Sequence, residues 1–184
     1  MLKLLMSRKI LVITNLLLFL TLTTGLIACS KSSKVERPLS LKQNKIRIEK
    51  LGNAEMSNLV QEVHRQINQY RRSLNLPPLS LNAQVSQTAA THSRNMAEGK
   101  VEFSHQGFDN RIQAIENDIS YRSAAENVAY NQGYSDPVSQ AVAGWIKSKG
   151  HRQNIVGNYN LTGIGVVKNQ QGEYYFTQIF ILRN

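Results

Sequence analysis

Cysteine is almost absent from this sequence, because only Cys29 among its 184 residues carries a thiol. A single cysteine cannot form an internal disulfide, so we expect the folded part of the chain to be held together by its hydrophobic core. The length is sufficient for one domain with a substantial core and hardly for two.

The sequence also lacks the short motifs of several enzyme classes. It contains no nucleophile elbow, no phosphate-binding loop and no helical two-histidine zinc motif. Ser93 and Ser104 each neighbour a histidine, but adjacency along a chain does not make a nucleophile and base pair.

Acidic residues are few, with 12 Asp and Glu against 22 Lys and Arg and a formal net charge of +10. The excess of basic residues lies near the N-terminus, since residues 1–50 hold ten Lys and Arg but only Glu36 and Glu49. The remainder has nearly balanced charge and no basic stripe interleaved with aromatic residues. We therefore expect no nucleic-acid partner.

The N-terminus has the features of a secretion signal. Lys3, Arg8 and Lys9 precede the apolar run Ile10–Leu22, which is short for an ordinary spanning helix, although a short membrane anchor helix is the alternative. The following Leu26-Ile27-Ala28-Cys29 resembles a bacterial lipobox, in which the signal is cut before a cysteine that becomes lipidated. We predict a lipoprotein signal peptide over residues 1–28 and an extracytoplasmic protein anchored to a bacterial cell membrane through lipidated Cys29.

Residues 29–53 are polar and basic and show no sustained periodicity. We interpret them as the lipidated cysteine followed by a flexible, solvated linker, with contact to an anionic membrane surface as the alternative. The folded domain is then expected over residues 54–184.

Helical periodicity occurs in several segments of this domain. A helix is predicted from about Ser57 to Leu74, and a second from Asn82 to Gly99. The second helix places His92 on its apolar side, where a structural role in the core is the favoured interpretation. A short helical pattern begins at Phe108.

The helix that contains the only tryptophan has the clearest boundaries. Asp136 is a good N-cap and Pro137 a good first residue, and the apolar stripe places Trp145 in the core. Gly150 suits the left-handed position after a last turn. We therefore expect the helix to stop there and to present His151 just beyond its end.

Three segments are predicted to be strands. Ala124–Tyr130 alternates as a strand does and carries Glu126, for which an edge-strand charge facing water is the simplest interpretation. The runs Leu161–Lys168 and Glu173–Leu182 are joined by a hairpin signal, and the second is apolar on both faces. Helices must cover both faces, which predicts an α+β fold: a three-layer α-β-α sandwich with a central, mainly antiparallel sheet.

The order of several short segments resembles the CAP superfamily, which includes cysteine-rich secretory proteins, antigen five and plant pathogenesis-related proteins, and especially its bacterial SCP-like extracellular members. The matching segments are Asn68-Gln69-Tyr70-Arg71, Leu76-Pro77-Pro78-Leu79, Ala89-Ala90-Thr91-His92-Ser93, Met96-Ala97, Phe103-Ser104-His105, Ala125-Glu126-Asn127-Val128-Ala129, Trp145, Gly150-His151-Arg152-Gln153-Asn154-Ile155 and Gly163-Ile164-Gly165-Val166. They span roughly residues 57–182, and the family's α-β-α sandwich agrees with the architecture inferred from periodicity.

The resemblance also implies a site. In this family two histidines and two acidic residues line a cleft, where some members bind a divalent metal; by motif, His105, Glu126 and His151 match three of the four. The fourth acid usually comes from the helix of Trp145, where this chain has Lys147-Ser148-Lys149. Two imidazoles and one carboxylate are an adequate zinc ligand set. We expect no required cofactor and at most a weakly bound divalent metal such as zinc; alternatively, Glu126 bridges the histidines by hydrogen bonds.

Three functions follow from these observations. The first is a lipid-anchored binding or interaction module that uses the cleft to bind a lipid, glycan or protein not identified by the sequence. The second is a metal-assisted hydrolase or peptidase with Glu126 as a weak catalytic candidate, and the third is a structural cell-envelope protein. We expect a binding protein rather than an enzyme, because one carboxylate cannot be both metal ligand and free general base.

Overall fold

The computed structural model describes residues 40–184, so the predicted signal peptide and Cys29 lie outside the described residues. The helices are α1 (Leu41–Ser73), α2 (Ala83–Ala97), α3 (Phe108–Glu116), α4 (Pro137–Lys147) and α5 (Lys149–Val156). The strands are β1 (Ser80–Leu81), β2 (Tyr121–Gln132), β3 (Leu161–Lys168) and β4 (Glu173–Arg183).

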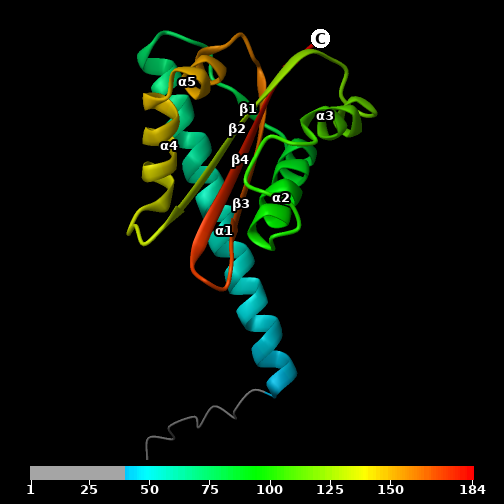
Figure 1. The fold of residues 1–184 in the computed structure, drawn as a ribbon, viewed down its shortest axis with the longest axis vertical. Coiled ribbons are helices and arrows are strands. Elements are labelled where there is room, and N and C mark those ends of the chain that lie inside the picture. Colours follow the sequence, from blue (N-terminus) through cyan, green and yellow to red (C-terminus); the bar gives the residue numbers. More distant parts are fainter. Residues whose placement is uncertain (1–39) are drawn as a thin grey trace, which may run out of the picture. The chain divides into compact units, whose positions relative to one another are not determined.

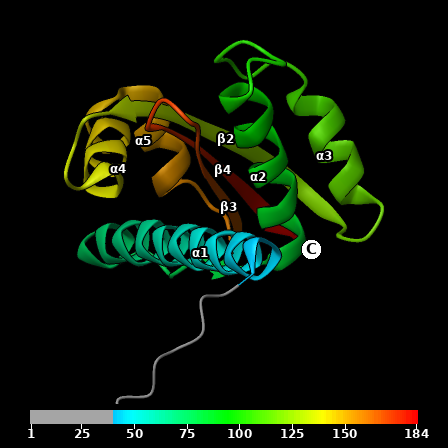
Figure 2. The same cartoon turned by 90° about the horizontal axis from the view of Figure 1, so that it is seen from below.

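The predicted α-β-α sandwich is confirmed. One four-stranded sheet has the order β1-β3-β4-β2; β4 pairs antiparallel with both β2 and β3, and the short β1 pairs parallel with β3. Helices α1, α4 and α5 cover one face and α2 and α3 cover the other, as the two ribbon views show (Figures 1 and 2). The hairpin between β3 and β4 is the one predicted from sequence.

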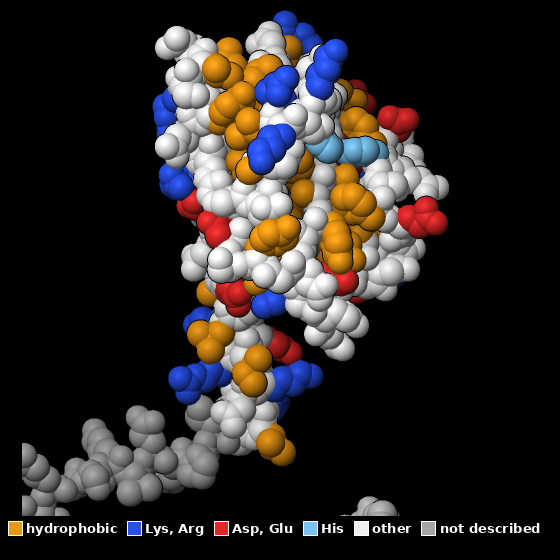
Figure 3. Space-filling model, turned by 60° about the vertical axis from the view of Figure 1, so that its left-hand side comes forward, with side chains coloured by type: hydrophobic (Ala, Val, Ile, Leu, Met, Phe, Trp, Pro, Cys, Tyr) orange, Lys and Arg blue, Asp and Glu red, His pale blue; other side chains and the backbone are white. Residues whose placement is uncertain are grey.

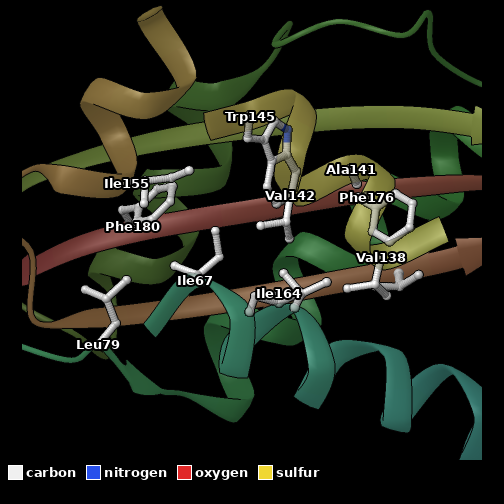
Figure 4. Close-up of a cluster of buried hydrophobic side chains, with 12 residues drawn as sticks. Ile67, Leu79, Val138, Ala141, Val142, Trp145, Ile155, Ile164, Phe176 and Phe180 are labelled. Carbon is white, nitrogen blue, oxygen red and sulfur yellow. The ribbon is translucent and has the colours of Figure 1, made fainter. Parts of the chain in front are cut away.

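Each face of the sheet has its own hydrophobic cluster. The larger cluster lies under α1, α4 and α5 and surrounds Trp145, which is 1% exposed (Figure 4). The smaller one lies under α2 and α3 and includes Val85, Ile115 and Ile179. All members of both clusters lie between residues 56 and 181, inside the compact unit Leu39–Asn184. Within the described residues, that unit therefore has a hydrophobic core of its own, as a separately folding domain requires.

Helix α2 lies unusually close to β3 because β3 has two glycines beneath it. A Cβ atom on Gly163 or on Gly165 would lie 2.2 Å from the α2 backbone, at Val85 or at Ala90. Such distances are well below van der Waals contact, so only glycine permits this approach. The contact fixes the height of α2, and hence of His92, above the sheet.

The flexible linker predicted over residues 29–53 is wrong for residues 41–53, which form the first turns of α1. Ser40 and Gln43 form a reciprocal capping box that satisfies free backbone groups at the helix start. The later turns of α1 pack on the sheet, so the first turns extend a helix whose costly nucleation has already occurred. Within residues 40–184, no helix is both long enough and apolar enough to cross a membrane.

The predicted stop at Gly150 is also wrong. Helix α4 ends at Lys147, and after Ser148 the chain enters α5, which contains both Gly150 and His151. Gly150 is not among the described glycines with positive φ, which are Gly99, Gly107, Gly133 and Gly172. The helical path is instead interrupted at Ser148, whose extended backbone changes the direction of the chain between α4 and α5.

Candidate functional site

Glu126 is the centre of the candidate site. It lies in the middle of β2, opposite Ile179 of β4, and its side chain is only 2% exposed. The edge-strand charge facing water is therefore the wrong interpretation of this residue. A buried carboxylate needs charged or hydrogen-bonding partners, and two of them reach it from neighbouring elements.

The first partner is Arg111 of α3. Its Nε donates to Glu126 Oε2 at 2.9 Å and its Nη2 donates to Oε1 at 2.8 Å, which is the two-point geometry that a guanidinium makes with a carboxylate. The Arg111 side chain is 13% exposed, so both charges of the pair are largely removed from water. Arg111 thereby connects α3 to the central sheet.

The second partner is His105, in the loop between α2 and α3. Its Nδ1 donates to Glu126 Oε1 at 3.0 Å, and its side chain is 51% exposed. The loop is held in place by further bonds, since Arg111 Nη1 donates to the Gln106 carbonyl and His92 Nε2 donates to the Ser104 carbonyl. His92 is 4% exposed, as the sequence predicted, and burial lowers its pKa.

His151 completes the neighbourhood from α5. Its ring centroid lies 6.4 Å from that of His105, with the two planes inclined by 48°. Its backbone is tied to the strand beside Glu126, because Asn127 Nδ2 donates to the His151 carbonyl. Burial, followed by repulsion from His105, lowers the pKa of His151.

The structure thus brings the three predicted residues together, although not in equivalent ways. Glu126 and His105 are in direct contact, whereas His151 faces His105 across the site. Histidine side chains form a pale blue group on the surface, with Lys and Arg side chains close by (Figure 3). Arg111 also lines an adjoining pocket of about 340 Å³ between α2 and α3, together with His92.

The residues present do not fit a divalent metal. Among residues 40–184, no three His, Cys, Asp or Glu side chains are placed so that they could hold one ion. Both carboxylate oxygens of Glu126 are occupied by Arg111, and the guanidinium charge would repel a cation at the same place.

Arg111 is the residue of this site that sequence analysis missed. It directly precedes Ile112 on the apolar stripe of a short helix, and Ile112 and Ile115 are both buried. A charged residue at the border of such a stripe is seldom buried without a partner. That position was the available signal, but it did not indicate which acid would pair with it.

A family model described as the cysteine-rich secretory protein (CAP) family matches residues 64–180. The uncharacterized membrane protein YlbC of Bacillus subtilis is 33% identical over 114 residues, covering 59% of this chain but only 30% of that protein. The chain therefore spans less than a third of the curated relative it matches.

Two solved structures show the same fold. An extracellular protein containing an SCP domain from Bacillus anthracis superposes with a TM-score of 0.61 at 25% identity, covering 79% of this chain and 45% of that one. An outer surface protein of Borrelia burgdorferi has a TM-score of 0.60 at 18% identity, covering 69% of this chain and 94% of that one. The second likeness is one of fold alone.

Proposed function

Because the chain belongs to the cysteine-rich secretory protein (CAP) family, we propose that it is an extracytoplasmic, lipid-anchored binding module rather than an enzyme. The proposed ligand site is the surface formed by His105, His151 and the Arg111–Glu126 pair. The lipobox at Cys29 supports the anchor, and the Bacillus relatives, one named as a membrane protein and one as extracellular, support the location.

One observation carries the proposal against catalysis: the Glu126 carboxylate is buried, and both of its oxygens already accept hydrogen bonds. A general base must have a free oxygen within reach of the proton it removes. The oxygens of Glu126 instead accept three hydrogen bonds, from His105 and from two nitrogens of Arg111. This arrangement favours a rigid recognition surface in which two imidazoles offer hydrogen bonds to a ligand.

The two alternatives require different arrangements. A metal-assisted hydrolase would need Glu126 either as a ligand or as a base, and Arg111 occupies the carboxylate in both cases. A structural envelope protein would need no ligand at His105 and His151. The exposed half of the His105 side chain is the feature that favours ligand binding over a purely structural role.

Catalysis is tested with the purified chain by zinc titration calorimetry and a broad hydrolase screen. We expect no zinc-dependent heat at micromolar zinc and no turnover. A hydrolytic rate that disappears in Glu126→Gln would overturn the assignment as a binding module.

Ligand binding is tested by mass spectrometry of molecules retained by the chain purified from its native membrane. We expect a retained lipid, glycan or protein whose occupancy falls in His105→Ala and in His151→Ala. His64→Ala is the matched control, since His64 bonds to the Leu79 carbonyl away from the site. Equal retention by all variants would remove His105 and His151 from the ligand site.

The anchor is tested by labelling cells with an alkyne-modified fatty acid. We expect label on the wild-type chain and none on Cys29→Ser. Equal labelling of both chains would contradict lipidation at Cys29.

A further inference from the structure

The first turns of α1 project beyond the body of the unit, and their side chains contribute nothing to either hydrophobic cluster (Figure 1). Every residue from Ser40 to Glu55 is exposed. Four large apolar side chains stand in water there: Leu41 is 91% exposed, Ile46 55%, Ile48 69% and Leu51 61%. Large apolar side chains that are gathered and exposed in one short segment often mark a surface that binds a partner or a membrane.

The apolar residues are arranged mainly on one side. At about 3.6 residues per turn, Leu41, Ile48 and Leu51 fall within an arc of about 80°, and Ile46 lies on the opposite side. The polar Asn44 falls within the same arc, between Leu51 and Ile48. Lys45 and Arg47 border this arc on its two sides, and Lys42 and Lys50 lie further round. Figure 3 shows hydrophobic side chains interleaved with Lys and Arg side chains along the projecting helix. An apolar arc bordered by long basic side chains is typical of helices that lie in a membrane interface.

Charge complementarity identifies the surface that would cover this arc. Residues 41–54 contain four Lys and Arg residues and a single acid, Glu49. The preceding residues 30–40 add Lys31, Lys34 and Arg37 against Glu36. Such a basic segment is attracted to anionic lipid head groups.

A second copy of the chain is the less suitable occupant. A helix pair would require apolar residues at heptad positions over several heptads, but the positions that would continue the pattern of Leu41, Ile48 and Leu51 hold Asn44 and Glu55. The net positive charge of the segment would also repel an identical segment in parallel alignment.

We propose that residues 41–54 of α1 form a membrane-surface helix that binds anionic lipid bilayers through Leu41, Ile48 and Leu51 and through the surrounding basic residues. The predicted lipidation site, Cys29, lies only twelve positions before Leu41, so both would act on the same bilayer. A basic amphipathic helix binds a membrane surface through its own apolar area and charge, in addition to any acyl chain. Binding of this helix to the bilayer does not depend on lipidation, because its proposed contacts with lipid come from α1 alone.

The test uses the unit Leu39–Asn184, which contains its own core and lacks Cys29, so that binding cannot come from an acyl chain. Its cosedimentation is measured with vesicles of phosphatidylcholine alone and with vesicles containing one quarter phosphatidylglycerol. We expect binding to the anionic vesicles, and weakening as salt is raised. Each basic residue near an anionic surface contributes about fivefold in affinity, so the triple variant K42Q/K45Q/K50Q should bind about a hundredfold more weakly.

Two further variants separate the contributions of charge and apolar surface. L41S/I48S/L51S should lose binding to anionic vesicles while the folded core keeps its melting temperature, because these side chains do not touch it. K100Q/K147Q/K149Q removes equal charge from exposed positions elsewhere and should bind nearly as the parent does. Absence of binding to anionic vesicles at about 0.1 M salt, where charges are screened beyond about 10 Å, or equal loss in the control, would overturn the proposal. Analytical ultracentrifugation tests the second copy as occupant. If the parent unit is a dimer and L41S/I48S/L51S is a monomer, the arc binds a second copy instead of a membrane.

Discussion

The guanidinium of Arg111 binds both carboxylate oxygens of Glu126, and it does so from a helix that is otherwise joined to the sheet by apolar contacts. The pair holds the negative charge of Glu126 in a nearly dry environment. It also takes the place that a metal ion would need. Stability, metal affinity and the position of His105 should therefore all respond to substitution of Arg111.

The first prediction concerns stability. Arg111→Met leaves the Glu126 charge buried without its main partner, and breaking a buried pair in this way costs about 3–5 kcal/mol. Adding Glu126→Gln should recover part of that loss, because the stranded charge is then absent. Urea denaturation of both single variants and the double variant measures the coupling.

Arg65→Met, which breaks the exposed pair with Glu62, is the control and should change stability little. Equal losses in the two Arg variants would contradict the buried pair.

The second prediction concerns metal. Chelator treatment should leave the melting temperature of the wild type unchanged, and added zinc should not raise it. Arg111→Met frees the Glu126 carboxylate beside His105, so zinc should raise the melting temperature of this variant by binding its folded state. Arg111→Met/His105→Ala is the control in which this gain should disappear. A wild type stabilised by zinc as strongly as the variant would refute metal exclusion by Arg111.

The third prediction concerns the two glycines beneath α2. Gly165→Ala places a Cβ within 2.2 Å of the Ala90 backbone, so α2 must move away from β3. Overpacking of this kind costs about 1–3 kcal/mol, and more where backbone is the obstacle. Gly144→Ala is the matched control, because its Cβ meets nothing within 4 Å and alanine favours helix. Thermal melts that show similar stability for both variants would mean that α2 does not pack this closely on β3.

The fourth prediction concerns pH. Burial lowers the pKa of both His92 and His151 below the ordinary value of 6.5, so their folded forms stay neutral while the unfolded chain takes up protons. Unfolding then binds protons, and stability is lost as pH falls below about 6.5. The melting temperature should decline between about pH 7.5 and about pH 5.5, and His151→Gln should make this decline shallower. A melting temperature that rises as the pH is lowered over this interval would contradict the lowered pKa of the two histidines.

The fifth prediction concerns Trp145. Trp145→Ala should cost about 3–5 kcal/mol, since the side chain is buried in the larger cluster. Trp145→Phe keeps most of the packing but removes the Nε1 donor to the Val128 carbonyl, with an expected cost of about 1–3 kcal/mol. Guanidinium denaturation distinguishes the two. Equal costs would mean that the packing of the Trp145 ring contributes nothing measurable beyond its hydrogen bond.

The sequence was informative where burial follows a regular period. The apolar stripe of α4 placed Trp145 in the core, and the two-sided apolar run of β4 required helices on both faces of the sheet. These features depend on residues close in sequence, so they can be found without a structure.

Features that depend on distant partners were not predictable in the same way. β1 has two residues and exists only through its pairing with β3. The first turns of α1 resemble a linker in composition, and their helicity is inherited from the packed turns that follow. At the site, the family motifs supplied His105, Glu126 and His151, whereas Arg111 pairs across fifteen positions and needed the fold to reveal it.

β2 lies at the edge of the sheet, where a twelve-residue strand could pair with a strand of another molecule. Its carbonyls at Glu126 and Val128 are not free for such pairing, because they accept hydrogen bonds from Asn154 Nδ2 and Trp145 Nε1. The α4–α5 segment therefore closes this edge against intermolecular strand addition. A protein crowded on a membrane surface would be protected in this way from sheet-to-sheet aggregation, and loss of the Asn154 and Trp145 donors would expose it to that risk.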